Sequence, residues 1–224
     1  MKLTHIIAFA FVLTQLTGCA SWSNTAKGGV IGAAAGGAVG AVIGKVAGNT
    51  ATGAVIGAAV GGTAGILIGR RMDKQAEEMQ ADLENARVER VGEGIIVTFD
   101  SGILFDFDKA DLKSQAKANI SDLAETLKKY DDTDVMIVGH SDSRGSDEYN
   151  LGLSERRAQS VSNYVSTLGV AGTRIQQVGK GESEPIADNE TDAGRQQNRR
   201  VEIAIYANEK MVKAAKRGDL EVDN

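Results

Sequence analysis

Asn150 and Arg157 are the residues whose types and spacing first suggest chemistry. They are seven residues apart in a segment, residues 147–168, whose pattern predicts a helix, so they lie two turns apart on one face. Arg157 interrupts a face that is otherwise apolar, and an inward guanidinium needs an anionic partner. That partner is either an internal carboxylate, from Asp142 or Asp108, or a ligand carboxylate held by the guanidinium fork.

Other kinds of chemistry have weaker support. One Cys and two His exclude a disulfide framework and a Cys-rich zinc site. His140 near Asp142 suggests a hydrolase, but no nucleophile-elbow motif accompanies them, and we interpret His140 as a packing residue. The D-x-D-x-x-D spacing at residues 106–111 lacks the Gly and terminal Glu of a calcium loop. We therefore expect no enzyme activity, no cofactor and no metal.

The net charge of −5 gives the chain no net basic surface, so we expect no nucleic-acid partner.

The elements that position these residues fall in residues 87–206, which are long enough for a single core. Apolar patterns alternate between the period of strands and the period of helices. Ser146 and Gly169 are suitable caps for the second helix. The pattern predicts a two-layer α/β sandwich, with strands at residues 88–91, 95–99, 135–138, 175–178 and 201–206 and helices at 116–127 and 147–168.

The N-terminal residues 1–18 read as a signal peptide, because Lys2 precedes a short apolar run that cannot span a bilayer. The run ends in Leu-Thr-Gly-Cys, which resembles the box of bacterial lipoproteins, in which the Cys is acylated. Cys19 is the only Cys in the chain. The resemblance implies acyl chains on Cys19, a tether at residues 19–27, and an outer-membrane location. The alternative is a general signal peptide with an incidental Cys.

Residues 28–70 contain an internal repeat rich in glycine. Fourteen of the 27 glycines lie here, most of them four residues apart, and residues 28–45 match 53–70 at eleven of eighteen positions. Glycines at this spacing form a bare stripe that a second helix can approach closely. We predict a helical hairpin turning at residues 48–50, with one helix over 53–69. It resembles glycine-zipper segments, which implies membrane insertion or a homo-oligomer; the alternative is a water-soluble hairpin packed on itself.

Two charged segments flank the predicted domain. Residues 71–86 predict a polar helical linker with a narrow apolar stripe. It is either a coiled-coil-like connector or a helix packed on the following domain. Residues 207–224 form a charged tail, for which a short frayed helix or disorder is the default expectation. A role of this tail in binding a partner stays open.

Four motifs give the domain a specific family resemblance. It is similar to the OmpA-like peptidoglycan-binding domain, which also occurs in peptidoglycan-associated lipoproteins. The resemblance covers about 120 residues and implies a mixed sheet with helices on one face. The motifs are Leu104-Phe105-Asp106-Phe107-Asp108-Lys109, Gly139-His140-Ser141-Asp142, Leu153-Ser154-Glu155-Arg156-Arg157-Ala158 and Asn198-Arg199-Arg200-Val201-Glu202-Ile203.

The family resemblance also implies a ligand and the residues that bind it. The ligand is the free end of diaminopimelate in the peptidoglycan stem peptide, which carries an ammonium and a carboxylate on one carbon. By motif position, Asp142 takes the ammonium and Arg157 the carboxylate, and secondary contacts come from Asp108, Asn150, Leu153 and Arg199.

With Cys19 acylated, the resemblance implies a lipoprotein that tethers the outer membrane to peptidoglycan from the periplasmic side. The alternative assigns the function to the glycine zipper, as an oligomeric membrane or envelope-assembly module for which wall binding is only anchoring.

Overall fold

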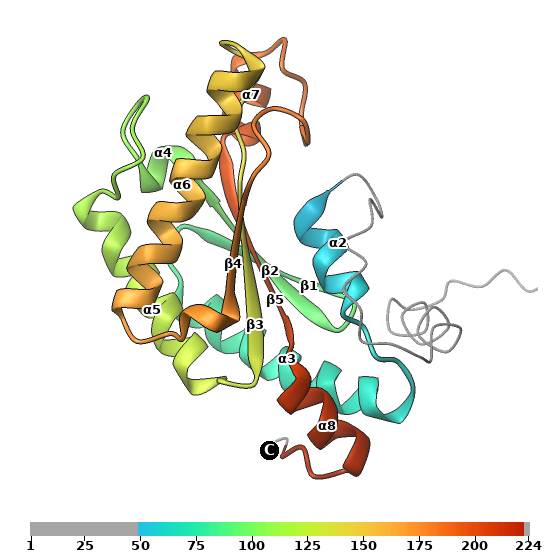
Figure 1. Ribbon diagram of the computed structural model, residues 1–224. Coiled ribbons are helices and arrows are strands. Elements are labelled where there is room, and N and C mark those ends of the chain that lie inside the picture. Colours follow the sequence, from blue (N-terminus) through green and yellow to red (C-terminus); the bar gives the residue numbers. More distant parts are fainter. Residues whose placement is uncertain (1–48, 222–224) are drawn as a thin grey trace, which may run out of the picture.

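The computed structural model describes residues 49–221, and the predicted signal peptide, lipidation site and first glycine repeat lie outside these residues. The elements follow the order β1 to β5 along the chain, with helices before, between and after them (Figure 1). Their bounds are α2 Thr50–Gly57, α3 Gly62–Asp82, β1 Ala86–Val91, β2 Gly94–Asp100, α4 Ser101–Leu104, α5 Ser114–Lys129, β3 Thr133–Gly139, α6 Asp147–Thr167, a 3₁₀ turn Gly172–Arg174, β4 Ile175–Gly179, α7 Asp192–Asn198, β5 Arg200–Ala207 and α8 Glu209–Arg217.

The five strands form one mixed sheet in the order β1-β2-β5-β3-β4. β3 and β4 are parallel, and the other neighbouring pairs are antiparallel. Helices α5 and α6 pack on one face of this sheet, as the expected mixed α/β sandwich requires (Figure 1). The main core lies between them and includes Ile120, Val161, Ile137 and Ile203, all with 0% exposure.

Local sequence signals account for the ends of α6. The Ser146 hydroxyl accepts a hydrogen bond from the Tyr149 N–H at 3.2 Å and so caps the first turn. Behind the helix, Gly169 has φ 100°, which a residue with a side chain rarely adopts. The predicted helix and its two caps are confirmed.

The prediction of one helix over residues 53–69 is wrong. α2 ends at Gly57 and α3 begins at Gly62, and between them Gly61 has φ 69°. The Glu93 carboxylate, from the β1–β2 turn, accepts the N–H groups of Val60 and Gly61 at 2.6 and 2.7 Å. This tertiary contact holds the chain in a turn where the repeat pattern alone favours a continuous helix.

The turn places α2 and α3 on opposite faces of the sheet (Figure 1). Ala51, Ala54 and Val55 of α2 form a small cluster with Met136 and Ala204, on the face that α5 and α6 leave uncovered. This additional helix, on the other face of the sheet, was not predicted from the sequence. None of the helices within residues 49–221 is both long and apolar enough to cross a membrane.

α3 is part of the main core. Of the two interpretations of residues 71–86, the helix packed on the following domain is therefore confirmed, and the coiled-coil-like connector is not. Ile68, Met72 and Met79 have 0% exposure and belong to the same cluster as the α5 and α6 core. Helix α8 covers α3 through Met211, which also has 0% exposure. The short helix expected in the tail is therefore present as α8, but it is capped and packed up to Arg217, so the expectation of fraying or disorder is wrong there.

Candidate functional site

Asp142 lies just beyond the end of β3, where the chain turns toward α6. Its Oδ1 accepts a hydrogen bond from the Arg144 N–H at 3.0 Å, which closes a local turn. The residue is 7% exposed. The end of β3 packs closely against α6 because residue 139 is a glycine. A Cβ there would lie 2.2 Å from the Ser154 carbonyl oxygen of α6. Backbone geometry therefore fixes the carboxylate close to the first turns of α6.

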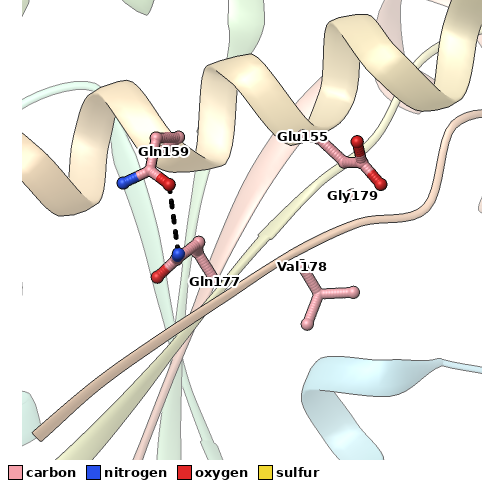
Figure 2. A pocket seen from close by; sticks show the side chains of 5 residues that line it. All are labelled: Glu155, Gln159, Gln177, Val178 and Gly179. Carbon is pink, nitrogen blue, oxygen red and sulfur yellow. Dashed lines mark hydrogen bonds between the residues drawn. The ribbon is translucent and has the colours of Figure 1, made fainter. Parts of the chain in front are cut away.

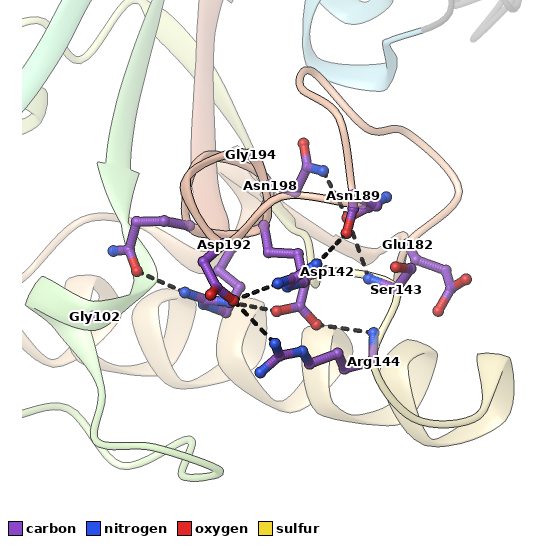
Figure 3. A network of polar contacts seen from close by, with 12 residues as sticks. Gly102, Asp142, Ser143, Arg144, Glu182, Asn189, Asp192, Gly194 and Asn198 are labelled. Carbon is purple, nitrogen blue, oxygen red and sulfur yellow. Dashed lines mark hydrogen bonds and ion pairs between the residues drawn. The ribbon is translucent and has the colours of Figure 1, made fainter.

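Asp142 forms an ion pair with Arg199 through Oδ2 and Nη1 (Figure 3). Arg199 follows the last residue of α7, and its Nη2 also donates to Gln196 Oε1 at 2.6 Å. α7 therefore sets the position of the guanidinium. The carboxylate that the family resemblance assigns to an ammonium already has a cationic partner in the free chain.

Arg157 points inward from α6, as the sequence predicts, and is 5% exposed. Its Nε donates to the Lys109 carbonyl oxygen at 3.0 Å, and its guanidinium lies 5.2 Å from the ring centre of Phe105. Burial lowers the pKa of Arg157, while the nearby Asp108 charge opposes that shift. Within residues 49–221 no ion pair joins this guanidinium to a carboxylate. Neither of the internal partners expected from the sequence, Asp142 and Asp108, forms an ion pair with the Arg157 guanidinium.

Asp108 occupies the loop after α4 and has φ 61°, a left-handed conformation that Asp tolerates better than most residues. The Tyr149 hydroxyl donates a hydrogen bond to its Oδ1. This bond, more than burial, raises the pKa of Tyr149. The loop is thereby held against the first turn of α6, and the Asp108 charge lies close enough to influence Arg157.

Asn150 and Leu153 complete the inward face of α6 and are 2% and 7% exposed. The Asn150 Nδ2 donates to the Asp142 carbonyl oxygen at 3.1 Å and to Glu182 Oε2 at 2.6 Å. Leu153 lies between Asn150 and Arg157 in the sequence of the helix. Hydrogen bonds, the ion pair and charge effects on Arg157 link all the predicted polar residues, and Leu153 adds an apolar side chain beside them.

α7 and the loop before it, which were not predicted from the sequence, complete the surroundings of Asp142 (Figure 3). Asn198 has 0% exposure, and its Oδ1 accepts the N–H groups of Ile186 and Ala187 at 2.8 and 3.0 Å. Its Nδ2 donates to Asn189 Oδ1 at 2.8 Å. One residue in the sequence could have indicated the start of α7. Thr191 is a suitable N-cap, and its Oγ1 accepts the Gly194 N–H at 3.0 Å.

Charged side chains surround the outer side of this loop. Asp192 in the first turn of α7 accepts hydrogen bonds from Arg144, at 2.9 Å, and from Arg195 (Figure 3). These ion pairs lower the pKa of Asp192, with the Arg195 bond contributing most. Arg144, Arg195 and Arg199 thus lie within one network, and their carboxylate partners are Asp192 of α7 and Asp142 beyond β3.

A separate shallow pocket lies between α6 and β4 and contains none of the predicted site residues (Figure 2). Within it the Gln177 Nε2 donates to Gln159 Oε1 at 3.1 Å. Residues of this pocket provide control positions, because they lie on α6 or β4 and none of them is a predicted site residue. They are Glu155, Gln159, Gln177, Val178 and Gly179.

His140 is 1% exposed, and burial, reinforced by the Arg200 and Lys180 charges, holds its pKa well below the usual value of 6.5. The nearest acidic atom is Glu202 Oε2, at 3.8 Å from His140 Nε2. Glu202 itself is bonded to Arg200 Nε at 2.7 Å. A base for hydrolysis must reach its substrate, so this environment suits the packing interpretation.

The chain matches two family models. Residues 104–199 match the OmpA family, and residues 1–73 match the YMGG-like Gly-zipper family. The chain is 46% identical over 116 residues to outer membrane porin F of Pseudomonas aeruginosa, a match that covers 51% of this chain and 33% of that protein. It is 40% identical over 118 residues to the probable lipoprotein YiaD of Escherichia coli, covering 53% and 54% of the two chains.

Solved structures share the fold. The cell wall anchor of the T6SS from Pseudomonas aeruginosa has a TM-score of 0.53 and 32% identity, covering 62% of this chain and 99% of that one. The periplasmic domain of Helicobacter pylori MotB has a TM-score of 0.51 and 21% identity, covering 62% and 90%, and shows the fold alone. The two curated relatives described above, by contrast, are matched over 33% and 54% of their own length.

Proposed function

We propose that this chain, whose residues 104–199 form a domain of the OmpA family, tethers an outer membrane to peptidoglycan without a covalent bond. The cell wall anchor of the T6SS from Pseudomonas aeruginosa, which is 32% identical to this chain, supports a wall-binding role for this fold. The relatives include an outer membrane porin and a probable lipoprotein, which supports an outer-membrane location. Acyl chains on Cys19 would supply the membrane attachment, since each buried methylene contributes about 0.8 kcal/mol.

The observation that carries the proposal is the buried Arg157 guanidinium without a carboxylate partner among residues 49–221. Burying a charge is costly unless a counter-charge compensates it. Arg199 adds to this cost, because its positive charge also lowers the pKa of Arg157. A ligand carboxylate placed between the two guanidinium groups would relieve both effects and could be held by a planar fork.

The acidic residues beside Arg157 define the second half of the ligand. Asp142 lies close enough to influence the Arg157 charge, so an anion at Arg157 has a carboxylate as its neighbour. An ammonium on the same carbon as the ligand carboxylate would fit that arrangement. We assign the ammonium to Asp142, the carboxylate to Arg157, and supporting contacts to Asp108, Asn150, Leu153 and Arg199. The free end of diaminopimelate has this chemistry.

Binding then requires an exchange of ion pairs. Asp142 is paired with Arg199 in the free chain, so the ligand ammonium must compete with that guanidinium. Once the Arg199 guanidinium has left Asp142, it can turn toward the ligand carboxylate. The ligand must break the existing Asp142–Arg199 pair before its own ion pairs form, and this cost predicts modest affinity at a single site. Many weak sites on one polymer still give firm attachment, because linked binding events reinforce each other.

Co-sedimentation of the purified full chain with diaminopimelate-type sacculi tests this function. We expect the wild type and Gln159→Ala, a control in the separate pocket, to pellet with the wall. Asp142→Ala and Arg157→Ala should stay in solution while keeping the circular dichroism of the wild type. A spin without sacculi controls for self-association. If Arg157→Ala fails to fold, Arg157→Lys replaces it. A wild type that stays in solution would overturn the proposal.

Sacculi in which lysine replaces diaminopimelate test the ligand assignment. Lysine keeps the ammonium but lacks the carboxylate on the same carbon. We expect binding to fall at least tenfold, which corresponds to about 1.4 kcal/mol. Equal binding to the two kinds of wall would show that Arg157 does not bind the diaminopimelate carboxylate that lysine lacks.

The match of residues 1–73 to the Gly-zipper model supports a second candidate, an oligomeric membrane or assembly module. In the described part, α2 from the second repeat packs on the sheet through Val55, so this repeat already has a partner within the chain. Detergent-resistant oligomers that disappear in Gly40→Leu would favour the second candidate over the tether.

A further inference from the structure

The side-chain amide of Asn150 is held by two acceptors at once. Its Nδ2 donates to the Asp142 carbonyl oxygen at 3.1 Å and to Glu182 Oε2 at 2.6 Å. An amide nitrogen has two hydrogens, so these bonds use its full donating capacity. The residue is 2% exposed, and an unmet donor there would be costly.

This arrangement determines which way the amide faces. A flipped amide would direct its oxygen at a carbonyl and a carboxylate, which are acceptors and cannot donate to it. Oδ1 must therefore point away from Asp142 O and Glu182. Among residues 49–221 no N–H or O–H group donates to Oδ1, so it remains available as an acceptor. It lies near Gly145, in the loop that follows Asp142.

Glu182 is itself fixed by its neighbour Gly181. The Gly181 carbonyl oxygen accepts the Ser141 N–H at 2.8 Å, and the Gly181 N–H donates to Ser154 Oγ at 2.8 Å. Gly181 has φ 52°, which favours glycine. The chain leaving β4 is thus bonded to the end of β3 and to α6 immediately before Glu182. A carboxylate on so constrained a backbone can orient another side chain.

We propose that Glu182 is a positioning residue that orients Asn150, so that Asn150 Oδ1 accepts a hydrogen bond from the ligand ammonium beside Asp142. This inference rests on the proposed function and adds a residue to it. The bond from Asn150 to Glu182 involves a charged acceptor, and such bonds are about twice as strong as neutral ones. Glu182 therefore contributes more to the amide orientation than the Asp142 carbonyl oxygen does.

The orientation also restricts the ligand. Asp142 Oδ2 and Asn150 Oδ1 are acceptors, so the group between them must carry at least two N–H bonds. A primary ammonium satisfies this condition, whereas a hydroxyl or an acetylated amine has a single hydrogen to donate. Glu182 thus favours ligands whose amine is free.

Binding of the full chain to a soluble diaminopimelate muropeptide, measured by isothermal titration calorimetry, tests the inference. We expect Glu182→Leu, which removes the acceptor, to weaken binding about tenfold. Glu182→Gln keeps an oxygen acceptor and should stay within about threefold of the wild type. Glu155→Leu, in the separate pocket, is the matched control and should bind as the wild type does. Thermal melts establish that each variant is folded.

A double-mutant cycle separates positioning from a direct or purely structural role. If Glu182 acts through Asn150, Glu182→Leu should add less than twofold to the loss caused by Asn150→Ala. The inference is overturned if Glu182→Leu binds as the wild type, if Glu182→Gln loses as much as Glu182→Leu, or if the two losses multiply. A wild type that does not bind the muropeptide would instead remove the proposed function.

Discussion

Asp142 and Arg199 form an ion pair in which the carboxylate side chain is 10% exposed and the guanidinium side chain is 32% exposed. Arg157, farther inside, has no such pair within the described residues. The two arginines therefore differ in what a ligand must displace. The carboxylate of the proposed ligand would reach Arg157 without breaking an ion pair, whereas Arg199 would first have to release Asp142.

This difference predicts unequal losses of wall binding. Arg157→Ala should weaken binding at least tenfold, because it removes the carboxylate contact with no compensation. Arg199→Ala should weaken it only about threefold, since the lost contact is offset by release of Asp142 for the ammonium. Sacculus titrations of the two folded variants measure the ratio. Equal losses would mean that the ion pair does not compete with the ligand.

The form of the charge at position 157 should matter as well as its sign. Arg157→Lys keeps the positive charge but loses the planar fork and the bond from Nε to the Lys109 carbonyl oxygen. We expect about a tenfold loss of muropeptide affinity with a thermal midpoint close to that of wild type. Affinity equal to wild type would indicate that a point charge suffices and that fork geometry is not read.

Stability should depend on pH through His140. Its pKa in the folded chain is well below 6.5 because of burial, so the unfolded chain binds a proton more readily. The free energy of unfolding should therefore decrease as the pH falls below about 6.5, by at most about 1.4 kcal/mol per pH unit. Above that pH the contribution is fully present. Urea unfolding at pH 7.5, 6.5 and 5.5 measures the slope.

The matching variant is His140→Gln, which cannot take up the proton. Its unfolding free energy should change less between pH 6.5 and 5.5 than that of the wild type. Parallel curves for the two proteins would assign the acid sensitivity to other groups. The neighbouring charges that face His140, from Glu202, Arg200 and Lys180, are present in each protein and so cancel in the comparison.

α7 should tolerate no added side chain at Gly194. A Cβ there would lie 1.9 Å from the Asp188 carbonyl oxygen, so Gly194→Ala must displace the loop or the helix. Such overpacking costs about 1–3 kcal/mol. Wall binding should also fall, because α7 positions Arg199. Gly172→Ala is the control: nothing lies within 4 Å of its Cβ, and we expect a change below about 0.5 kcal/mol. Indistinguishable melts would contradict this packing.

The predicted domain boundary at residue 87 leaves part of the core outside the domain. Ile68, Met72 and Met79 of α3 are fully buried against it. A fragment of residues 87–224 should therefore unfold at a lower urea concentration than a fragment of residues 49–224, and should bind more of a hydrophobic dye. Equal urea midpoints would show that α3 contributes little to the core and that the boundary is correct.

The sequence predicted the parts of the fold that depend on local signals. The strands and α6 follow from hydrophobic periodicity, with Ser146 and Gly169 marking the helix ends. α7 was missed because seven residues give too little periodicity, and its anchoring by Asn198 depends on contacts with a loop eleven to twelve residues earlier. The α2–α3 turn was missed because the carboxylate that holds it, Glu93, is over thirty residues away.

In the candidate site, too, local signals predicted some residues, whereas contacts between distant residues were not predicted. Family motifs predicted Asp142 and Arg157 as candidate site residues, and helical spacing placed Asn150 on the face of Arg157. The Asp142–Arg199 pair and the Glu182–Asn150 bond join residues 57 and 32 positions apart, respectively. No periodic pattern encodes such pairs, because their geometry is set by where β4 and α7 end and where β5 begins.

The entry of the chain into the domain has a mechanical consequence. Asn49 Nδ2 donates to Glu202 Oε1 at 3.1 Å, and Thr50 donates to Glu184 through N and Oγ1 at 2.9 and 2.6 Å. Tension applied ahead of Asn49 is therefore borne first by these polar bonds and only afterwards by the apolar contacts of α2. Glu202 lies on β5, which begins one residue after Arg199. A pulling force thus enters the fold both through the strand that leads from the candidate site and through Glu184 in the loop between β4 and α7.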